Sequence, residues 1–193
     1  MSHANMLTDA EVREIDELLW LSLPGFAKNV EKRKVLHIEA TRIGKETAKD
    51  YPVNMDNIVL SLENINVNGL EFFSKEDSDR AYYMVDERKI YVNELFIIEM
   101  ADYFKSQAMP YYTFETIKNA LVLHEAYHHI EETITKPTDE LLESKFNTFV
   151  PQIYRDIAAF SYANSIMGTT ICQMIDIFWL KKHHPRQFKA FYQ

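Results

Sequence analysis

The chain contains 193 residues, of which 47% are hydrophobic, and its 21 Lys and Arg against 29 Asp and Glu give a net charge of −8. This length fits one domain, and the apolar content is high enough to build a core, which excludes an intrinsically disordered protein. A net acidic chain lacks the clustered positive charge through which proteins bind nucleic-acid phosphates or anionic membranes. We therefore expect a single folded domain over residues 1–193 that has no direct nucleic-acid partner and no membrane partner.

The cysteine and glycine content excludes further classes of site. Cys172 is the only cysteine, so neither an intramolecular disulfide nor a cysteine-based zinc site can form. The four glycines form neither of the glycine-rich loops that bind nucleotide phosphates. The N-terminus lacks the basic and apolar segments of a signal peptide, and Asn164, Gln173 and Asp176 interrupt the most apolar stretch, residues 157–180. We expect a cytoplasmic protein in which Cys172 stays reduced.

Helical patterns predict N-terminal helices within residues 1–50. Thr8 and Glu11 fit a capping box that begins a helix ending near Leu23. Residues 27–50 are typical of an exposed amphipathic helix. The apolar positions of that second helix are Val35, Ile38 and Ile43.

A core segment, residues 56–168, follows. It opens with a short helix that Asp56 is expected to cap and that ends at Leu62, with Ile58 and Val59 also facing inward. Runs of β-forming residues then predict three short strands, and a polar turn joins the last two as a hairpin. The expected strands are residues 70–73, 81–85 and 90–93.

Every segment after residue 93 has a helical pattern. The expected helices cover residues 94–107, 113–134, 139–147, 151–167 and 170–183, with the last in a C-terminal segment, residues 169–193. Gly168 is expected to end the fourth of these helices. The sequence therefore predicts an α+β fold that is mostly helical, with a small antiparallel sheet packed on the helix at 113–134.

The 113–134 helix carries the motif with the clearest chemistry. His124, Glu125 and His128 form H-E-x-x-H, a pattern that seven histidines in this chain would produce by chance roughly 0.02 times. At about 100° per residue, His124 and His128 lie on one helix face, one turn apart. Two imidazoles so placed can bind one Zn²⁺, and Glu125 can act as the general base on a bound water. An interior helix whose histidines only form hydrogen bonds is the alternative.

A tetrahedral zinc site needs a third protein ligand. His129 points away from His124 around the helix, so we expect it to be solvated or to lie behind the ligands. Glu131 is on the right face but lies beyond His128, where it closes a tetrahedron poorly. Asp156 on the next long helix is the better candidate, because Ala159 and Ala163 on the same face would let the two helices approach closely. The alternative for Asp156 is an acidic residue that offsets a helix dipole.

These residues, in this order, resemble the ImmA/IrrE family of zinc metallopeptidases over about residues 56–168. The family pattern is a strand ending I-x-V/I-N, then H-E-x-x-H, then E-x-x-A, and here residues 90–93 read IYVN. The resemblance implies a zincin-like domain in a cytoplasmic protease that cleaves transcriptional repressors. It also implies that His124 and His128 bind the metal, that Glu125 is the catalytic base, and that Asp156 stands in for the glutamate that is the third ligand.

The chain departs from the family pattern in three ways. Asp156 is one methylene shorter than glutamate, so its helix must come closer or the site is weaker. Tyr127 replaces a small residue before the second histidine and is expected to crowd the helix against its neighbour. The segment 94–119 is longer than usual and adds a helix that either covers the cleft or, with its apolar side chains, joins the core.

The resulting hypothesis is a zinc-dependent metallopeptidase that hydrolyses a protein or peptide substrate, and the resemblance implies a regulatory or repressor protein as that substrate. The strand ending at Asn93 is expected to align the substrate by β-addition. One alternative is a non-catalytic member of the same fold, with or without metal, that acts as an interaction module. Another is a di-iron helical protein built on Glu125-x-x-His128, but the chain has no second E-x-x-H for that design.

Overall fold

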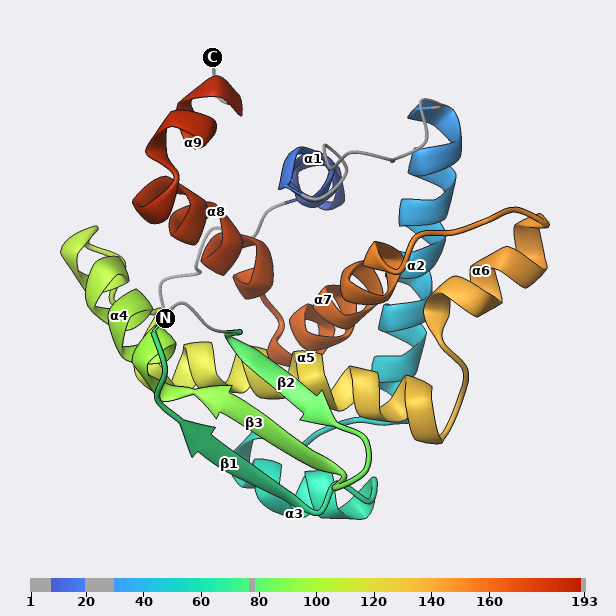
Figure 1. Cartoon of the computed structure of the whole chain (residues 1–193), viewed down its shortest axis with the longest axis horizontal. Coiled ribbons are helices and arrows are strands. Elements are labelled where there is room, and N and C mark those ends of the chain that lie inside the picture. The colour runs from blue at the N-terminus through green and yellow to red at the C-terminus, as the bar shows by residue number, and fades with distance from the viewer. Residues whose placement is uncertain (1–7, 20–29, 77–78, 192–193) are drawn as a thin grey trace.

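The computed structural model describes residues 8–19, 30–76 and 79–191 (Figure 1). The helices are α1 (Asp9–Leu19), α2 (Val30–Asp50), the 3-10 turn η1 (Met55–Asn57), α3 (Ile58–Asn64), α4 (Glu94–Ser106), α5 (Phe114–Thr133), α6 (Thr138–Phe146), α7 (Ile153–Met167), α8 (Ile171–His183) and α9 (Pro185–Phe191). The strands are β1 (Gly69–Phe73), β2 (Ala81–Met84) and β3 (Lys89–Asn93). The expected α+β class, mostly helical with one small sheet, is confirmed.

The sheet is mixed, so the expectation of a wholly antiparallel sheet is wrong. Its strand order is β1-β3-β2, with β2 antiparallel to β3, as the hairpin pattern predicts, and β1 parallel to β3. The connection from β1 to β2 must pass the end of β3, and the buried Asn93 side chain holds it there by donating to the carbonyls of Lys75 (2.8 Å) and Asp79 (3.3 Å). Strand composition identifies strands but not their partners, which is why the parallel pair was not foreseen.

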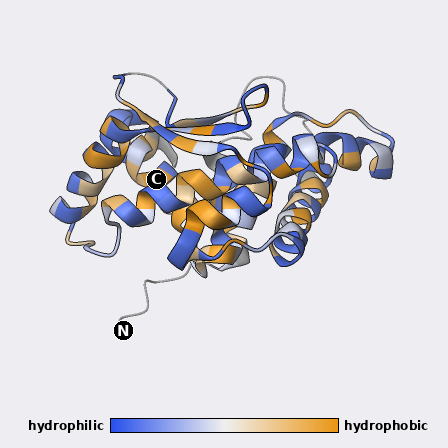
Figure 2. Cartoon of the chain, turned by 90° about the horizontal axis from the view of Figure 1, so that it is seen from below, coloured by the Kyte–Doolittle hydropathy of each residue, from blue (hydrophilic) through white to orange (hydrophobic). Residues whose placement is uncertain are grey.

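Helix α5 lies at the centre of the fold. It packs against α7, α4 and α8 and against the inner face of the sheet, where Ile90 and Val92 are fully buried (Figure 1). Hydrophobic segments gather in the central helices, and hydrophilic ones lie toward the periphery (Figure 2). The motif helix is buried over most of its circumference, and Ile117, Leu123 and Ile130 are all fully buried.

Helix α2 buries a different face from the one expected. Val35 and Ile38 are 47% and 56% exposed, whereas Ala40 and Gly44 are buried. A Cβ at Gly44 would lie 2.1 Å from the carbonyl oxygen of Ala158, so the two helices α2 and α7 touch at this glycine. Small residues permit such a close approach of two backbones. The face of α2 that packs on α7 therefore carries small residues, and the large apolar residues Val35 and Ile38 do not identify it.

The two predicted N-terminal caps have different outcomes. The capping box of α1 is confirmed, since the Thr8 amide donates to Glu11 Oε2 (2.7 Å) and the Glu11 amide donates to Thr8 Oγ1 (3.2 Å). The predicted cap at Asp56 is wrong, because Asn57 caps α3: its Oδ1 accepts from the Leu60 amide in the first turn of the helix (3.3 Å). The expected end of the first helix near residue 23 and the expected start of the second at residue 27 lie outside the described residues.

The inward face of α3 is also only partly as expected. Leu62 is buried and Ile58 is half-buried, but Val59 is 52% exposed.

The later helices agree with the sequence pattern to within two residues at each end. Gly168 ends α7 with a left-handed φ of 63°, as predicted. Helix α9 was not predicted; Pro185 begins it, a position where a proline costs no intrahelical hydrogen bond. Helix α4 belongs to the core, because Ile97, Met100 and Phe104 are fully buried. Within the described part of the chain, none of the helices combines the length and the apolar character needed to span a membrane.

Candidate metal centre

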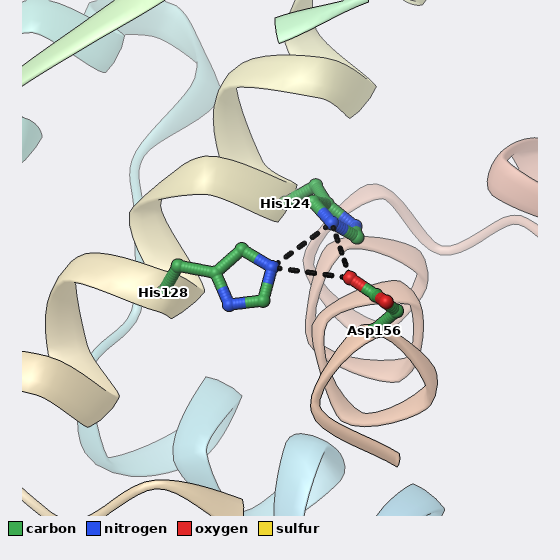
Figure 3. Close-up of side chains that lie close together, drawn as sticks. All are labelled: His124, His128 and Asp156. Atoms are coloured by element: carbon green, nitrogen blue, oxygen red, sulfur yellow. Dashed lines mark hydrogen bonds and ion pairs between the residues drawn. The ribbon is translucent and has the colours of Figure 1, made fainter. Parts of the chain in front are cut away.

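The two histidines of the motif converge on one point beside α5. Thr113 begins the helix by accepting the Thr116 amide (3.2 Å), and the uninterrupted helical register then places His124 and His128 one turn apart. Their Nε2 atoms are 3.1 Å apart, and both rings turn toward the neighbouring helix α7 (Figure 3). The predicted common face of the two imidazoles is therefore present in the structure.

Asp156 on α7 completes a group of three. Its Oδ1 lies 3.5 Å from Nε2 of His124 and 3.4 Å from Nε2 of His128 (Figure 3). Ala159 and Ala163 are fully buried, and α7 packs against α5, which agrees with the predicted close approach of the two helices. The shorter aspartate consequently reaches the two imidazoles.

The spacing of these three atoms fits a tetrahedral metal ion. Ligands at about 2.0–2.1 Å from a zinc-sized ion at tetrahedral angles lie about 3.3–3.4 Å from one another. The three observed separations are 3.1, 3.4 and 3.5 Å. His124, His128 and Asp156 form the one group of three or more potential ligands found in the described ranges, and this group can hold a metal ion.

The electrostatics of the group favour a protonated His128 beside an ionised Asp156. Burial disfavours the charged form of His128, but hydrogen bonds to Asp156 and Glu131 outweigh it and raise its pKa to about 10. Burial opposes ionisation of Asp156, but the two imidazoles lower the pKa of that carboxyl well below its usual range. A metal ion would replace this proton, so binding of a cation to the group should release protons.

Glu131 orients His128 from behind the cluster. Its Oε1 lies 2.7 Å from His128 Nδ1 and also accepts from Arg155 Nε at 2.7 Å. Its Oε2 accepts from the backbone amide of Thr138 at 3.0 Å, and the side chain is 1% exposed. Sequence reasoning treated Glu131 only as a weak ligand and missed this role, although its i+3 spacing from His128 was the available signal.

Glu125 lies at the same cleft but does not belong to the ligand group. The residue is 8% exposed, and burial raises the pKa of its carboxyl, while the two imidazoles and the backbone of Tyr83 lower it in part. Its side chain and those of His124, His128 and Asp156 line one cavity of about 670 Å³. This arrangement suits a group that exchanges protons with a molecule bound at the ligands.

His129 is buried and its side chain bonds to Tyr83 and Ile65, so the expectation that it is solvated or lies behind the ligands is wrong. Its Nδ1 lies 2.7 Å from the Tyr83 hydroxyl and its Nε2 lies 2.5 Å from the carbonyl oxygen of Ile65. Burial lowers the pKa of this imidazole. As predicted, it points away from the ligand group, and its contacts fasten α5 to β2 and to the end of α3.

Tyr127 does not push α5 away from α7. Its ring lies 5.7 Å from that of Tyr162, and its hydroxyl lies 2.5 Å from Thr138 Oγ1 at the start of α6. The large side chain therefore fills a space between α5, α6 and α7, and Asp156 still reaches the histidines.

Residues of β2, α4, α5, α7 and α8 line the cleft. The expectation that the strand ending at Asn93 aligns a substrate is not supported, because this strand, β3, is central in the sheet. The strand at the edge beside the cleft is β2.

Fold and site together define an α+β protein with a candidate three-ligand metal centre in an open cleft. Comparisons of the chain with family models, with curated proteins and with solved structures give no match.

Proposed function

We propose that this protein is a zinc-dependent metallopeptidase of the ImmA/IrrE type that hydrolyses a protein substrate. The observation that carries the proposal is the convergence of His124, His128 and Asp156 at tetrahedral spacing, with Glu125 buried beside them. Two imidazoles and one carboxylate suit Zn²⁺, and three protein ligands leave a fourth position for water or substrate, as in catalytic zinc sites. A cytoplasmic location fits Cys172, which is a buried free thiol.

When bound, Zn²⁺ would supply Lewis-acid polarisation of the scissile carbonyl and of a water molecule. Glu125 accepts the proton of that water at its carboxylate and later passes it to the leaving amine. Burial raises the pKa of this carboxyl in the metal-free site. Glu131 keeps the His128 ring in a fixed orientation throughout.

The edge of β2 offers a place for the substrate backbone. The Asn93 amide donates to the Arg80 carbonyl (2.9 Å), so residues 80 and 93 form a hydrogen-bonded pair of the β2–β3 ladder. Such pairs occur at every second residue of an antiparallel ladder, and the backbone N–H and C=O groups of Ala81 and Tyr83 therefore point away from β3. Tyr83 also lies close enough to Glu125 for its backbone to lower the pKa of that carboxyl. An extended peptide added to β2 would therefore pass directly by the proposed base.

The test combines metal analysis with one isosteric variant. Purified protein should contain one zinc per chain, and Glu125→Gln should retain that zinc and the parent's thermal stability. Against a co-encoded repressor-like protein or a peptide library, the variant should cleave about 10²–10⁴-fold more slowly than the parent. Equal cleavage rates would rule out the proposed base. Binding of a partner by both proteins without cleavage by either would favour the alternative, a non-catalytic interaction module.

A further inference from the structure

We infer that Arg155 is a positioning residue of the metal centre, which acts through Glu131 to hold the ring of His128 in the orientation that a metal ion requires. The inference rests on the metal binding of the proposed function and not on its hydrolytic step. Arg155 lies outside the motif helix, on α7, directly before the third candidate ligand Asp156.

The carboxylate of Glu131 is held at both of its oxygens. Oε2 accepts from the amide and the hydroxyl of Thr138, at 3.0 and 3.1 Å, and the Tyr127 hydroxyl lies 2.5 Å from the same Thr138 hydroxyl. Oε1 lies 2.7 Å from His128 Nδ1 and accepts from Arg155 Nε at 2.7 Å. Because the Glu131 side chain is only 1% exposed, these partners and not bulk water determine its orientation.

The oxygen that faces His128 depends on Arg155. A metal ion bound at Nε2 of His128 leaves the ring proton on Nδ1, where Glu131 Oε1 accepts it. Arg155 supplies the positive charge that is paired with this carboxylate from outside α5. Without the guanidinium, Thr138 would still hold Oε2, but Oε1 would be free to turn away from the ring.

Arg155 suits this role because of its geometry and its place in the chain. Nε donates to Glu131 while Nη2 pairs with Glu132, so the planar guanidinium spans two consecutive residues of α5. The next residue along α7 is Asp156, so one turn of α7 supplies a ligand to the metal and a donor to the carboxylate behind His128. A shift of α7 along α5 would disturb both contacts at once.

A purely structural ion pair between α5 and α7 is the alternative role for Arg155. Both roles predict a loss of stability when the guanidinium is removed, because the buried Glu131 carboxylate loses a charged partner. Only the positioning role predicts that the affinity and the geometry of the metal site change while the fold stays intact. The metal site itself is therefore the quantity to measure.

The test compares Arg155→Met with the parent in two metal measurements. Competition with a chelator gives the zinc affinity, and the visible absorption of the Co²⁺-loaded protein reports the coordination geometry. We expect Arg155→Met to bind zinc about 10- to 100-fold more weakly, the usual effect of losing an outer partner of a metal-bound histidine. Its Co²⁺ spectrum should differ from that of the parent. Arg155→Lys keeps the charge but cannot form the same fork, so it should lose part of the affinity.

Arg80→Met is the matched control. Arg80 also lines the cleft and forms an ion pair with a buried carboxylate, that of Asp176, which is 4% exposed. Its guanidinium lies over the rings of Phe96 and Trp179, and none of these three partners is a candidate ligand. This variant should lose stability, as Arg155→Met does, but keep the zinc affinity and the Co²⁺ spectrum of the parent.

A double variant tests whether Arg155 acts through Glu131. Glu131→Gln removes the charge that the guanidinium holds, so adding Arg155→Met to it should weaken zinc binding no further. Melting curves check that each variant is folded. If Arg155→Met does not fold, Arg155→Lys takes its place in both comparisons.

The outcomes separate the two proposals. A zinc affinity and a Co²⁺ spectrum like those of the parent in the Arg155 variant would overturn the inference and leave a structural ion pair. Additive losses in the double variant would also overturn it, since Arg155 would then act independently of Glu131. Failure of the parent to bind zinc would contradict the proposed function, and the positioning role with it. A parent that binds zinc but hydrolyses no protein would count against hydrolysis alone, because the comparison of zinc affinities stands without it.

Discussion

His128 Nδ1 and Glu131 Oε1 lie 2.7 Å apart on consecutive turns of α5, and this contact fixes the ring that faces Asp156. His124 has no equivalent, since its buried Nδ1 lacks a hydrogen-bond partner among the residues that the structure describes. Its ring is placed by packing against Phe160 instead. The two imidazoles of the cluster are thus held by different means, one by a charged hydrogen bond and the other by an aromatic contact.

Glu131→Gln should weaken zinc binding by about 10- to 100-fold, because it keeps the shape but removes the charge that orients His128. The measurement is a competition titration with a chelator. Glu132→Gln is the matched control, since Glu132 also pairs with Arg155, whereas the carboxylate paired with His128 Nδ1 is that of Glu131. Equal zinc affinities in the two variants would show that Glu131 serves only to join α5 to α7.

Asp156→Ala should abolish stoichiometric zinc binding, because two imidazoles alone leave the ion with too few protein ligands. His129→Ala should lose stability through its broken contacts with Tyr83 and Ile65 but keep its zinc. Metal content after gel filtration compares the two. Similar zinc retention in both would mean that the third ligand has been misassigned.

Gly44→Ala should destabilise the fold by about 1–3 kcal/mol, because the new Cβ would meet the Ala158 carbonyl oxygen at 2.1 Å. The displaced α7 would also carry Asp156 away from the histidines, so zinc affinity should fall as well. Gly69→Ala is the control, since a Cβ there has no heavy atom within 4 Å in the described structure. Urea unfolding and the chelator titration measure both effects, and a Gly44→Ala protein as stable as the parent would contradict the close contact.

Glu39 should contribute about 1 kcal/mol to stability at neutral pH and nothing in strong acid. Hydrogen bonds from Arg42 and Lys145 lower its pKa from 4.5 to about 2, so the folded state favours the ionised form. That contribution is fully present above pH 4.5 and is lost as the pH falls toward 2.

The measurement is the difference in the free energy of unfolding between the parent and Glu39→Gln at several pH values. Glu46→Gln, which removes a partner of Arg42 but touches no residue of α6, should show a smaller difference. A Glu39→Gln difference that does not shrink on acidification would show that the carboxylate charge is not its source.

Local features of the chain could be predicted because they depend on neighbours in the sequence. The capping box of α1, the left-handed residue Gly168 and the common face of His124 and His128 all follow from backbone geometry within one or two turns. The β2–β3 hairpin follows likewise from β-forming runs around a polar turn. The motif and its helix were therefore determined by the sequence itself.

Tertiary structure decided what depends on how distant segments approach one another. The parallel pairing of β1 with β3 and the burial of Gly44 against α7 have no local signature, because partner choice and close backbone contact are settled only in the packed chain. The alanines of α7 suggested that Asp156 could reach the histidines, but only the packing of α5, α7 and α2 gives the 3.4 and 3.5 Å separations. The sequence by itself thus determined which side chains can bind a metal, and the tertiary structure decided that their ligand atoms meet at the spacing a metal requires.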